Sequence, residues 1–288
     1  MVNVALHDAD NTKYPNLVLM KLAAHHRARG DSVEWYSPLF SQYDKMYSSK
    51  VFSWTPDNQY LPGDVVRGGT GYNQFADLPD AIEHACPDYS LYGIDYSLGF
   101  LTRGCHKKCK WCIVPRKEGG IREHADITEF LRHREVVLMD NNVLASDHGI
   151  RQIDKMAGLD VKVDFNQGLE AGLIDKTIAS KLARLKWRRC IRIACDNQAA
   201  KKPAGAAVKH LRGAGYRGEI FCYVLVQGIP DALNRVEFLR GLGVDPFAQP
   251  FRDEHNTPPT REQRQFARWV NHKAIFKTVK WAEYSAYY

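Results

Sequence analysis

Three regularly spaced cysteines are the residues of this sequence best suited to chemistry. Cys105, Cys109 and Cys112 form a C-x3-C-x2-C pattern, and no fourth cysteine follows nearby. A cubane iron–sulfur cluster has four irons, and each iron needs a ligand. Three thiolates from one short loop bind three irons and leave the fourth open to a molecule that is not protein. Because an open metal position distinguishes catalytic from structural metal sites, the pattern predicts a catalytic cluster.

Two other uses of these thiols remain open at this point. The cysteines could bind zinc together with His106, although structural zinc loops more often repeat C-x2–4-C pairs at two places. They could also be unliganded core thiols, but Lys107, Lys108 and Lys110 make the loop too polar to be buried as packing. The iron–sulfur interpretation is therefore preferred.

The cysteine spacing resembles the cluster loop of the radical S-adenosylmethionine superfamily, and the aromatic Trp111 just before the third cysteine is part of the resemblance. In that family, the amino and carboxylate groups of the cofactor's methionine chelate the open iron of a [4Fe–4S] cluster. An electron from the cluster cleaves the cofactor to a 5′-deoxyadenosyl radical, which abstracts hydrogen from a substrate. The resemblance implies that Cys105, Cys109 and Cys112 bind the cluster and that Trp111 packs near the adenine. Ferredoxin cysteine spacings are different.

Strands and helices alternate regularly over residues 97–255. Strands are predicted at 98–102, 135–139, 161–165, 190–194, 220–226 and 245–251, with helices at 127–133, 149–157, 173–185, 204–213 and 232–240. The alternation predicts an α/β fold with a parallel sheet and helices on its outside. Six such units are similar to the partial (β/α)6 barrel of radical S-adenosylmethionine enzymes. Active sites of barrels lie at the carboxyl ends of the strands.

Polar side chains follow almost every predicted strand of this region. They include Asp140, Asn141, Asn142, Asn166, Gln167, Glu170, Asp196, Asn197, Gln198, Gln227 and Gln249. Short polar side chains also cap helices, but capping alone does not explain so many amides at one edge. The resemblance implies that Asp140 and Asn141 replace a Gly-Gly-Glu-like motif at the cofactor's amino group. It also implies that Asn166 and Asp196 hold the ribose hydroxyls and that Gln227 flanks the adenine.

Residues 1–80 are predicted to form a small α/β domain, with strands at 2–6, 32–36 and 64–67 and a helix at 16–29 that ends before Gly30. This order resembles a truncated, Rossmann-like version of the cobalamin-binding domain that precedes many radical S-adenosylmethionine cores. The Asp-x-His-x-x-Gly motif, whose histidine ligates cobalt in that family, is missing from the sequence. We therefore expect no cobalamin binding. Residues 81–96, which contain Pro87, are expected to be a linker.

The C-terminal tail, residues 256–288, is predicted to be helical. Its aromatic residues alternate with arginines and lysines, which suits base stacking, but a helix packed over the barrel mouth is the preferred interpretation. His255 and Asn256, in the loop before the tail, are expected to line the substrate opening. The remaining cysteines are interpreted as spare or small core residues: Cys86, Cys190, Cys195 and Cys222.

Composition agrees with an enzyme of the cytoplasm. The chain has 288 residues, of which 44% are hydrophobic, enough for a sizeable core. It contains no apolar run of about 18 residues and no secretory leader pattern, so no membrane association is expected. The seven cysteines are odd in number and unevenly spaced, which argues against a disulfide framework and for a reducing compartment.

These features together predict a radical S-adenosylmethionine enzyme that cleaves its cofactor reductively and abstracts hydrogen from an unidentified substrate. The net charge of +7 indicates an anionic partner, and a nucleic-acid base is the first candidate substrate. Reduced flavodoxin or ferredoxin is the expected electron donor. The alternative is a non-catalytic iron–sulfur or zinc protein that binds nucleic acid.

Overall fold

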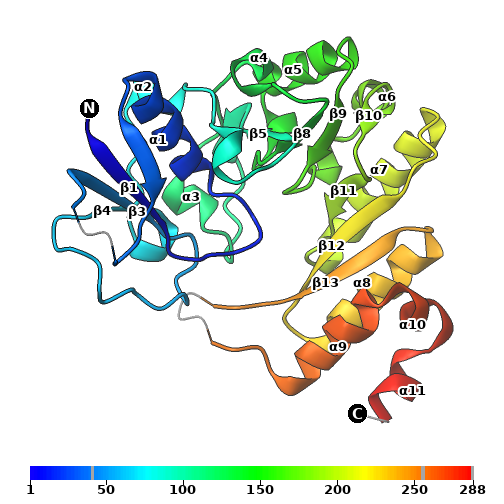
Figure 1. The fold of residues 1–288 in the computed structure, drawn as a ribbon. Coiled ribbons are helices and arrows are strands. Elements are labelled where there is room, and N and C mark those ends of the chain that lie inside the picture. The colour runs from blue at the N-terminus through cyan, green and yellow to red at the C-terminus, as the bar shows by residue number, and fades with distance from the viewer. Residues whose placement is uncertain (40–41, 254–256, 287–288) are drawn as a thin grey trace.

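The computed structural model describes residues 1–39, 42–253 and 257–286. It is a mixed α/β protein with parallel sheets and a helical C-terminal tail, as predicted. In Figure 1, the N-terminal lobe (residues 1–80, blue to cyan) lies beside the strands of the core region, residues 97–253, and the C-terminal helices (red) lie below β13.

Four parallel strands form the sheet of the N-terminal lobe, in the order β2-β1-β3-β4. Their bounds are β1 Asn3–Asp8, β2 Ser32–Trp35, β3 Lys45–Ser49 and β4 Val66–Gly68, and the 3-10 helix η1 follows at Thr70–Tyr72. Three of these strands are predicted from the sequence, whereas β3 is missed. The β3 run contains two serines and no apolar alternation, and Ser48 and Ser49 are buried only because the strand lies between β1 and β4.

Helix α1 (Leu17–Ala28) connects the lobe to the core region. The side chain of Asn16 caps its first turn, and the helix ends before Gly30, whose φ of +81° is readily adopted by glycine. Leu19 and Leu22 pack in the cluster around β1. Leu17 and Met20 pack instead with residues of β5 and β8. One helix therefore fills the space between the two sheets.

The segment predicted as a linker contains two short helical turns, α2 (Asp80–Glu83) and η2 (Tyr89–Leu91). Side chains here join the lobe to the core. The ammonium of buried Lys21 lies 3.2 Å from Oε1 of Glu83, and Nε2 of His124 lies 3.3 Å from the same oxygen. Nδ1 of His84 lies 2.8 Å from Oε2 of Glu129. Although burial alone would raise the pKa of Glu83, His124 and Lys21 outweigh it and lower the pKa to about 2.

Parallel strands of the core follow one another in chain order. They are β5 Ser97–Gly99, β8 Glu135–Leu138, β9 Lys162–Phe165, β10 Lys186–Trp187, β11 Ile191–Ala194, β12 Ile220–Val226 and β13 Asp245–Pro250. One sheet has the order β10-β9-β8-β5 and the other β11-β12-β13. A single bridge between Leu169 and Ile193 links them. The predicted fourth strand, 190–194, corresponds to β11, whereas the short strand β10 is not predicted.

The first predicted core strand, 98–102, is split in two. The chain leaves the parallel sheet after β5 and forms β6 (Thr102–Arg103), which pairs antiparallel with β7 (Arg122–Glu123). The cause is Asp140, whose carboxylate accepts the backbone amides of Leu101 and Thr102. Those amides are therefore not available to a neighbouring strand.

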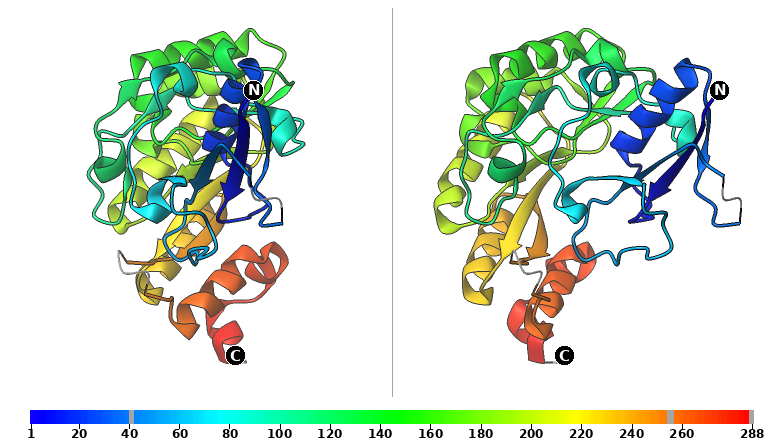
Figure 2. Two further views of the ribbon diagram at one scale, coloured as in Figure 1. Left: turned by 60° about the vertical axis from the view of Figure 1, so that its left-hand side comes forward. Right: turned by 90° about the vertical axis from the view of Figure 1, so that its left-hand side faces the viewer.

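Helices cover the outside of the core strands, as Figures 1 and 2 show. The helices of the core region are α3 Val114–Lys117, α4 Ile127–Phe130, η3 Val143–Ala145, α5 Asp147–Ala157, η4 Ala171–Leu173, α6 Lys176–Ala183, η5 Gln198–Ala200, α7 Lys201–Gly213 and α8 Ile229–Gly241, of which α3 lies beside the N-terminal lobe (Figure 1). On β12, Cys222, Val224 and Val226 are buried in the main core with the helices. The alternate residues Phe221 and Tyr223 are only half-buried, on the opposite face of the sheet.

The tail consists of α9 (Arg261–Asn271), α10 (Lys273–Thr278) and α11 (Trp281–Ala286). A capping box between Thr260 and Gln263 begins α9, which packs on β13. Trp269 and Phe266 of α9 are buried in the main core and contact each other, so these two rings are not available to stack on a base. Within residues 1–39, 42–253 and 257–286, no helix has the length and apolar character needed to cross a membrane.

Candidate functional site

The three cysteines lie in one loop, residues 104–113, between β6 and α3. The base of this loop is closed by backbone contacts. The amide of Cys105 donates to the carbonyl of Gly119 at 3.2 Å. Gly104 has a φ of +78°, and a Cβ atom there would lie 2.1 Å from the carbonyl oxygen of Gly120. Only glycine fits this position, because both the left-handed conformation and the close approach exclude a side chain.

Glu118 holds the two ends of the cysteine loop together. Its side chain is 5% exposed, and its Oε2 accepts the backbone amide of Gly104 and Nδ2 of Asn141, each at 3.0 Å. Nε of Arg103 lies 3.2 Å from the same oxygen. Sequence reasoning gave this residue no role in the site, because spacing alone does not show that its side chain reaches back to Gly104.

The thiols are close to one another and to the ends of two strands. Sγ of Cys105 accepts the backbone amide of Lys107 and Nδ2 of Asn142, both at 3.4 Å. Burial raises the pKa of Cys109 and of Cys112, and the neighbouring thiols and Asp196 add to the rise. Asp196 follows β11, so β11 contributes a carboxylate to the surroundings of the cysteines.

Glu170, after β9, ties the cysteine loop to the carboxyl edge of the sheet. Its Oε1 lies 2.7 Å from the ammonium of Lys107, and its Oε2 lies 3.5 Å from Nε2 of His106. The same Oε2 accepts Nδ2 of Asn142 at 2.6 Å. Glu170 thus holds the first half of the loop against the strand ends.

Asn142 carries a polar atom without a partner. The residue is 3% exposed, and its Oδ1 is buried with no hydrogen-bond partner among the described residues. Exchanging the amide oxygen and nitrogen would set Oδ1 against the Glu170 carboxylate, so the orientation is fixed by that contact. A buried acceptor without a donor is costly, by about 1–3 kcal/mol. The free acceptor belongs to the amide that touches Cys105, so it lies beside the thiols.

Asp140 is oriented toward the chain that precedes the cysteines. Its Oδ1 accepts the amides of Leu101 and Thr102 and the hydroxyl of Thr102, at 3.1, 2.5 and 2.7 Å. Its Oδ2 accepts the Leu101 amide at 3.2 Å. Burial raises the pKa of Asp140 to about 6, and these hydrogen bonds only partly offset that effect. Asp140 therefore fixes where β6 begins.

Two further predicted site residues follow β9 and β11. Asn166 is half-buried, and its carbonyl accepts the hydroxyl of Tyr223 at 2.9 Å. Oδ1 of Asp196 accepts the amide of Leu225 at 3.1 Å, and burial raises the pKa of Asp196. Both residues thus lie at the same edge of the sheet as Asn142 and Glu170, as the parallel strand order requires.

The remaining predicted site residues are less enclosed. Trp111 is half-buried in the cysteine loop. Gln227 is exposed after β12, and its carbonyl accepts Nε2 of Gln263 in α9 at 2.9 Å. His255 and Asn256, expected to line the substrate opening, lie outside the described residues.

The three thiols of the loop fit a cluster with several irons better than a single metal ion. Within the part of the chain that the structure describes, no group of three or more His, Cys, Asp or Glu side chains lies close enough to hold one metal ion. A cubane cluster takes each thiolate at a different iron, so its donors need not converge on one point. Sulfurs that ligate such clusters usually accept hydrogen bonds, and Cys105 accepts two here.

Comparison with known proteins gives little beyond this geometry. No protein-family model matches the chain, and no curated protein matches it. Among solved structures, the chain is similar to the crystal structure of Streptococcus suis SuiB, with a TM-score of 0.47 and 12% identity. The match covers 72% of this chain and 54% of that chain, so the chain spans about half the length of SuiB. Similarity at this level does not identify a function.

Proposed function

We propose that this chain is a radical S-adenosylmethionine enzyme with a [4Fe–4S] cluster on Cys105, Cys109 and Cys112, and that residues 97–255 form the partial (β/α)6 barrel of that family. The observation that carries the proposal is the cysteine loop itself. It is closed at its base by Gly104 and Glu118, and one of its thiols adjoins the unpartnered acceptor of Asn142.

The protein's part is to hold and orient the bound groups. The three thiolates would bind three irons of the cluster, which together with S-adenosylmethionine would supply reductive cleavage of the cofactor and hydrogen abstraction. Oδ1 of Asn142 would accept a hydrogen bond from the cofactor's ammonium, because the carboxylate of Asp140 is already engaged by the amides of Leu101 and Thr102 and by the Thr102 hydroxyl.

Residues at the other strand ends complete the cofactor site in this proposal. Asn166 and Asp196 would hold the ribose hydroxyls, while Trp111 and Gln227 would flank the adenine. The exposed Lys108 and Lys110 add positive charge beside the thiols. Positive charge of this kind suits an acidic flavodoxin or ferredoxin as electron donor and an anionic substrate, both within a reducing cytoplasm.

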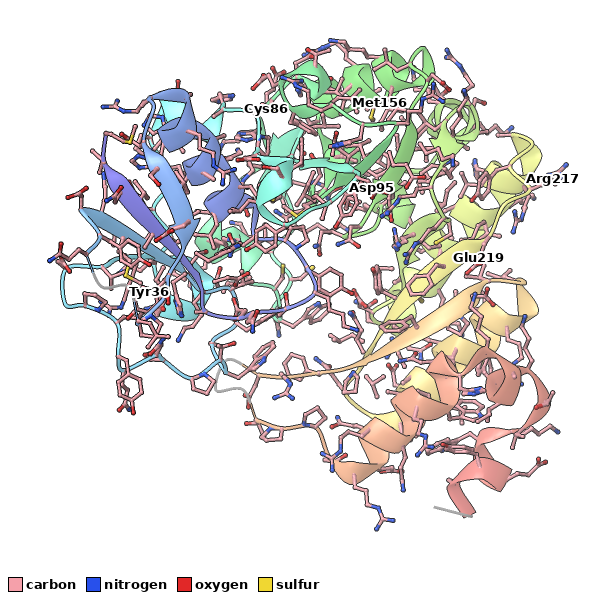
Figure 3. The ribbon with its side chains drawn as sticks, viewed as in Figure 1. Tyr36, Cys86, Asp95, Met156, Arg217 and Glu219 are labelled. Carbon is pink, nitrogen blue, oxygen red and sulfur yellow. The ribbon has the colours of Figure 1, made fainter. Side chains whose placement is uncertain are left out.

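The test is cofactor cleavage by the reconstituted enzyme. The chain would be loaded anaerobically with iron and sulfide, reduced with dithionite in the presence of S-adenosylmethionine, and assayed for 5′-deoxyadenosine and methionine. The proposal expects about four irons per chain and both products. Cys109→Ser should abolish product formation. Cys86→Ser is the matched control, because this half-buried thiol lies on the segment between the lobe and β5, outside the loop (Figure 3).

Two results would overturn the proposal. One is a chain that holds iron yet neither binds nor cleaves S-adenosylmethionine. The other is a chain whose loop takes up zinc and not iron, measured by elemental analysis of wild type and Cys109→Ser. Either result would leave a non-catalytic metalloprotein that binds nucleic acid as the remaining explanation.

A further inference from the structure

One face of the core sheet carries aromatic side chains that lie outside the clusters formed with the described helices. Phe221 and Tyr223 on β12 and Phe247 on β13 are half-buried, opposite the helix-covered face. At the other end of the sheet, the same face of β5 and β8 is covered by α1. The three rings thus lie on the sheet face that α1 covers at β5 and β8.

The three rings form one connected surface. The centroids of Phe221 and Phe247 are 5.3 Å apart with planes at 31°, and those of Phe221 and Tyr223 are 5.1 Å apart at 80°. The hydroxyl of Tyr223 donates to the carbonyl of Asn166, which holds its ring at the carboxyl edge. Burial raises the pKa of Tyr223, and Tyr14 adds to the rise, so the loop before α1 lies near this surface.

An ion pair lies beside the rings. Asp164 of β9 and Arg192 of β11 are 3% and 8% exposed and form a salt bridge. Arg192 lies opposite Phe221 in the strand register, with its guanidinium 6.0 Å from that ring. Beyond the ion pair, the described residues give neither side chain a hydrogen-bond partner. A guanidinium has five N–H donors and a carboxylate about four acceptor sites, so both have capacity left for a ligand.

We infer that this surface binds an unpaired base of a single-stranded nucleic acid, stacked on Tyr223, Phe221 and Phe247 with its polar edge toward Asp164 and Arg192. The inference deepens the proposed function, on which it rests, by naming the substrate class. A nucleobase has a flat ring and adjacent donors and acceptors, which match the rings and the paired carboxylate and guanidinium. The net charge of +7 and the exposed Lys108 and Lys110 complement the phosphates.

The test is binding of labelled oligonucleotides to the full chain without S-adenosylmethionine, measured by fluorescence anisotropy. Single-stranded RNA and DNA of one sequence are the probes, and an abasic strand with the same phosphates is the matched ligand control. Tyr223→Ala and Phe247→Ala should each weaken binding about tenfold or more, because stacking on an aromatic side chain contributes about 1–3 kcal/mol per base. Tyr223→Phe keeps the stacking ring and loses only the bond to Asn166, so it should bind much more tightly than Tyr223→Ala.

Tyr60→Ala is the matched protein control, since Tyr60 is 87% exposed on the N-terminal lobe. The inference is overturned if the abasic strand binds as well as the full strands. It is equally overturned if Tyr223→Ala and Phe247→Ala, with wild-type circular dichroism, keep wild-type affinity. Either failure leaves cofactor cleavage untouched, because 5′-deoxyadenosine is assayed separately without oligonucleotide. The tighter of the two full strands identifies the sugar of the substrate.

Discussion

The carboxylate of Glu118 accepts the backbone amide of Gly104 at 3.0 Å and so joins the residues on either side of the three cysteines. The same oxygen lies 3.2 Å from Arg103 and accepts Asn141, which follows β8. The base of the loop is therefore held by a side chain other than the three cysteines.

Replacing this carboxylate should loosen the loop. Glu118→Ala leaves Arg103 without its partner, and breaking a buried pair of this kind costs about 3–5 kcal/mol. We expect a lower free energy of unfolding in urea and fewer irons retained per chain. Glu123→Ala is the matched control, because Glu123 and its partner Arg151 are 63% and 62% exposed, and it should change the free energy by about 1 kcal/mol or less. Equal effects of the two variants would contradict this account.

The close approach at the base of the loop gives a second prediction. Gly104→Ala places a Cβ 2.1 Å from a backbone oxygen, so the loop must open and reconstituted iron content should fall well below that of wild type. Gly119→Ala has a similar φ of +73° but no atom within 4 Å of the added Cβ. It should cost only about 1–2 kcal/mol and keep its iron. If both variants retain their iron, the close approach of Gly104 to the backbone is not needed for iron binding.

Asp140 gives a prediction on pH. Its pKa is raised from 3.8 to about 6, so the folded state binds more protons than the unfolded state between these values. The contribution to stability is then fully present below pH 3.8 and is lost as the pH rises through 6. Asp140→Asn does not titrate. Its free energy of unfolding relative to wild type should therefore rise between pH 4 and 7, by up to about 3 kcal/mol. A difference that stays constant over this range would contradict the raised pKa.

Glu83 gives the opposite dependence. Its pKa is lowered from 4.5 to about 2, so its contribution is present above pH 4.5 and lost as the pH falls through 2. Glu83→Gln should lower the free energy of unfolding at pH 7 by about 3 kcal/mol, and the gap to wild type should narrow below pH 4. Asp80→Asn is the control, because the Asp80 side chain is 98% exposed. The measurement is the free energy of unfolding of wild type, Glu83→Gln and Asp80→Asn in urea at pH 3.5, 5 and 7.

The strands could be predicted where apolar runs are long and bounded by turn residues. The predicted strand at 220–226 has the same bounds as β12, since its alternate residues are buried against the helices. The split of the first core strand could not be predicted, because it depends on Asp140 taking two amides from a segment about forty residues earlier. β3 was missed because its run has no apolar alternation, although its two serines are buried between β1 and β4.

The site could be predicted in part. Cysteine spacing predicts one loop, and the rule that polar residues follow strands finds Asn142 and Glu170. That rule does not say which way each side chain points. Asp140 was expected to face a cofactor, but it faces the backbone before the cysteines. Glu118 was given no role, because its partners are brought to it only by the folded chain.

The single bridge between Leu169 and Ile193 has a mechanical consequence. β11, β12 and β13 pair along their length, whereas in the described chain one isolated bridge joins the segment after β9 to β11, beside the salt bridge of Asp164 and Arg192. Backbone amides exchange with solvent fastest where few cross-strand bonds protect them. The backbone is therefore least rigid between β9 and β11. This boundary separates the strands beside the cysteine loop from the strands that carry the aromatic rings.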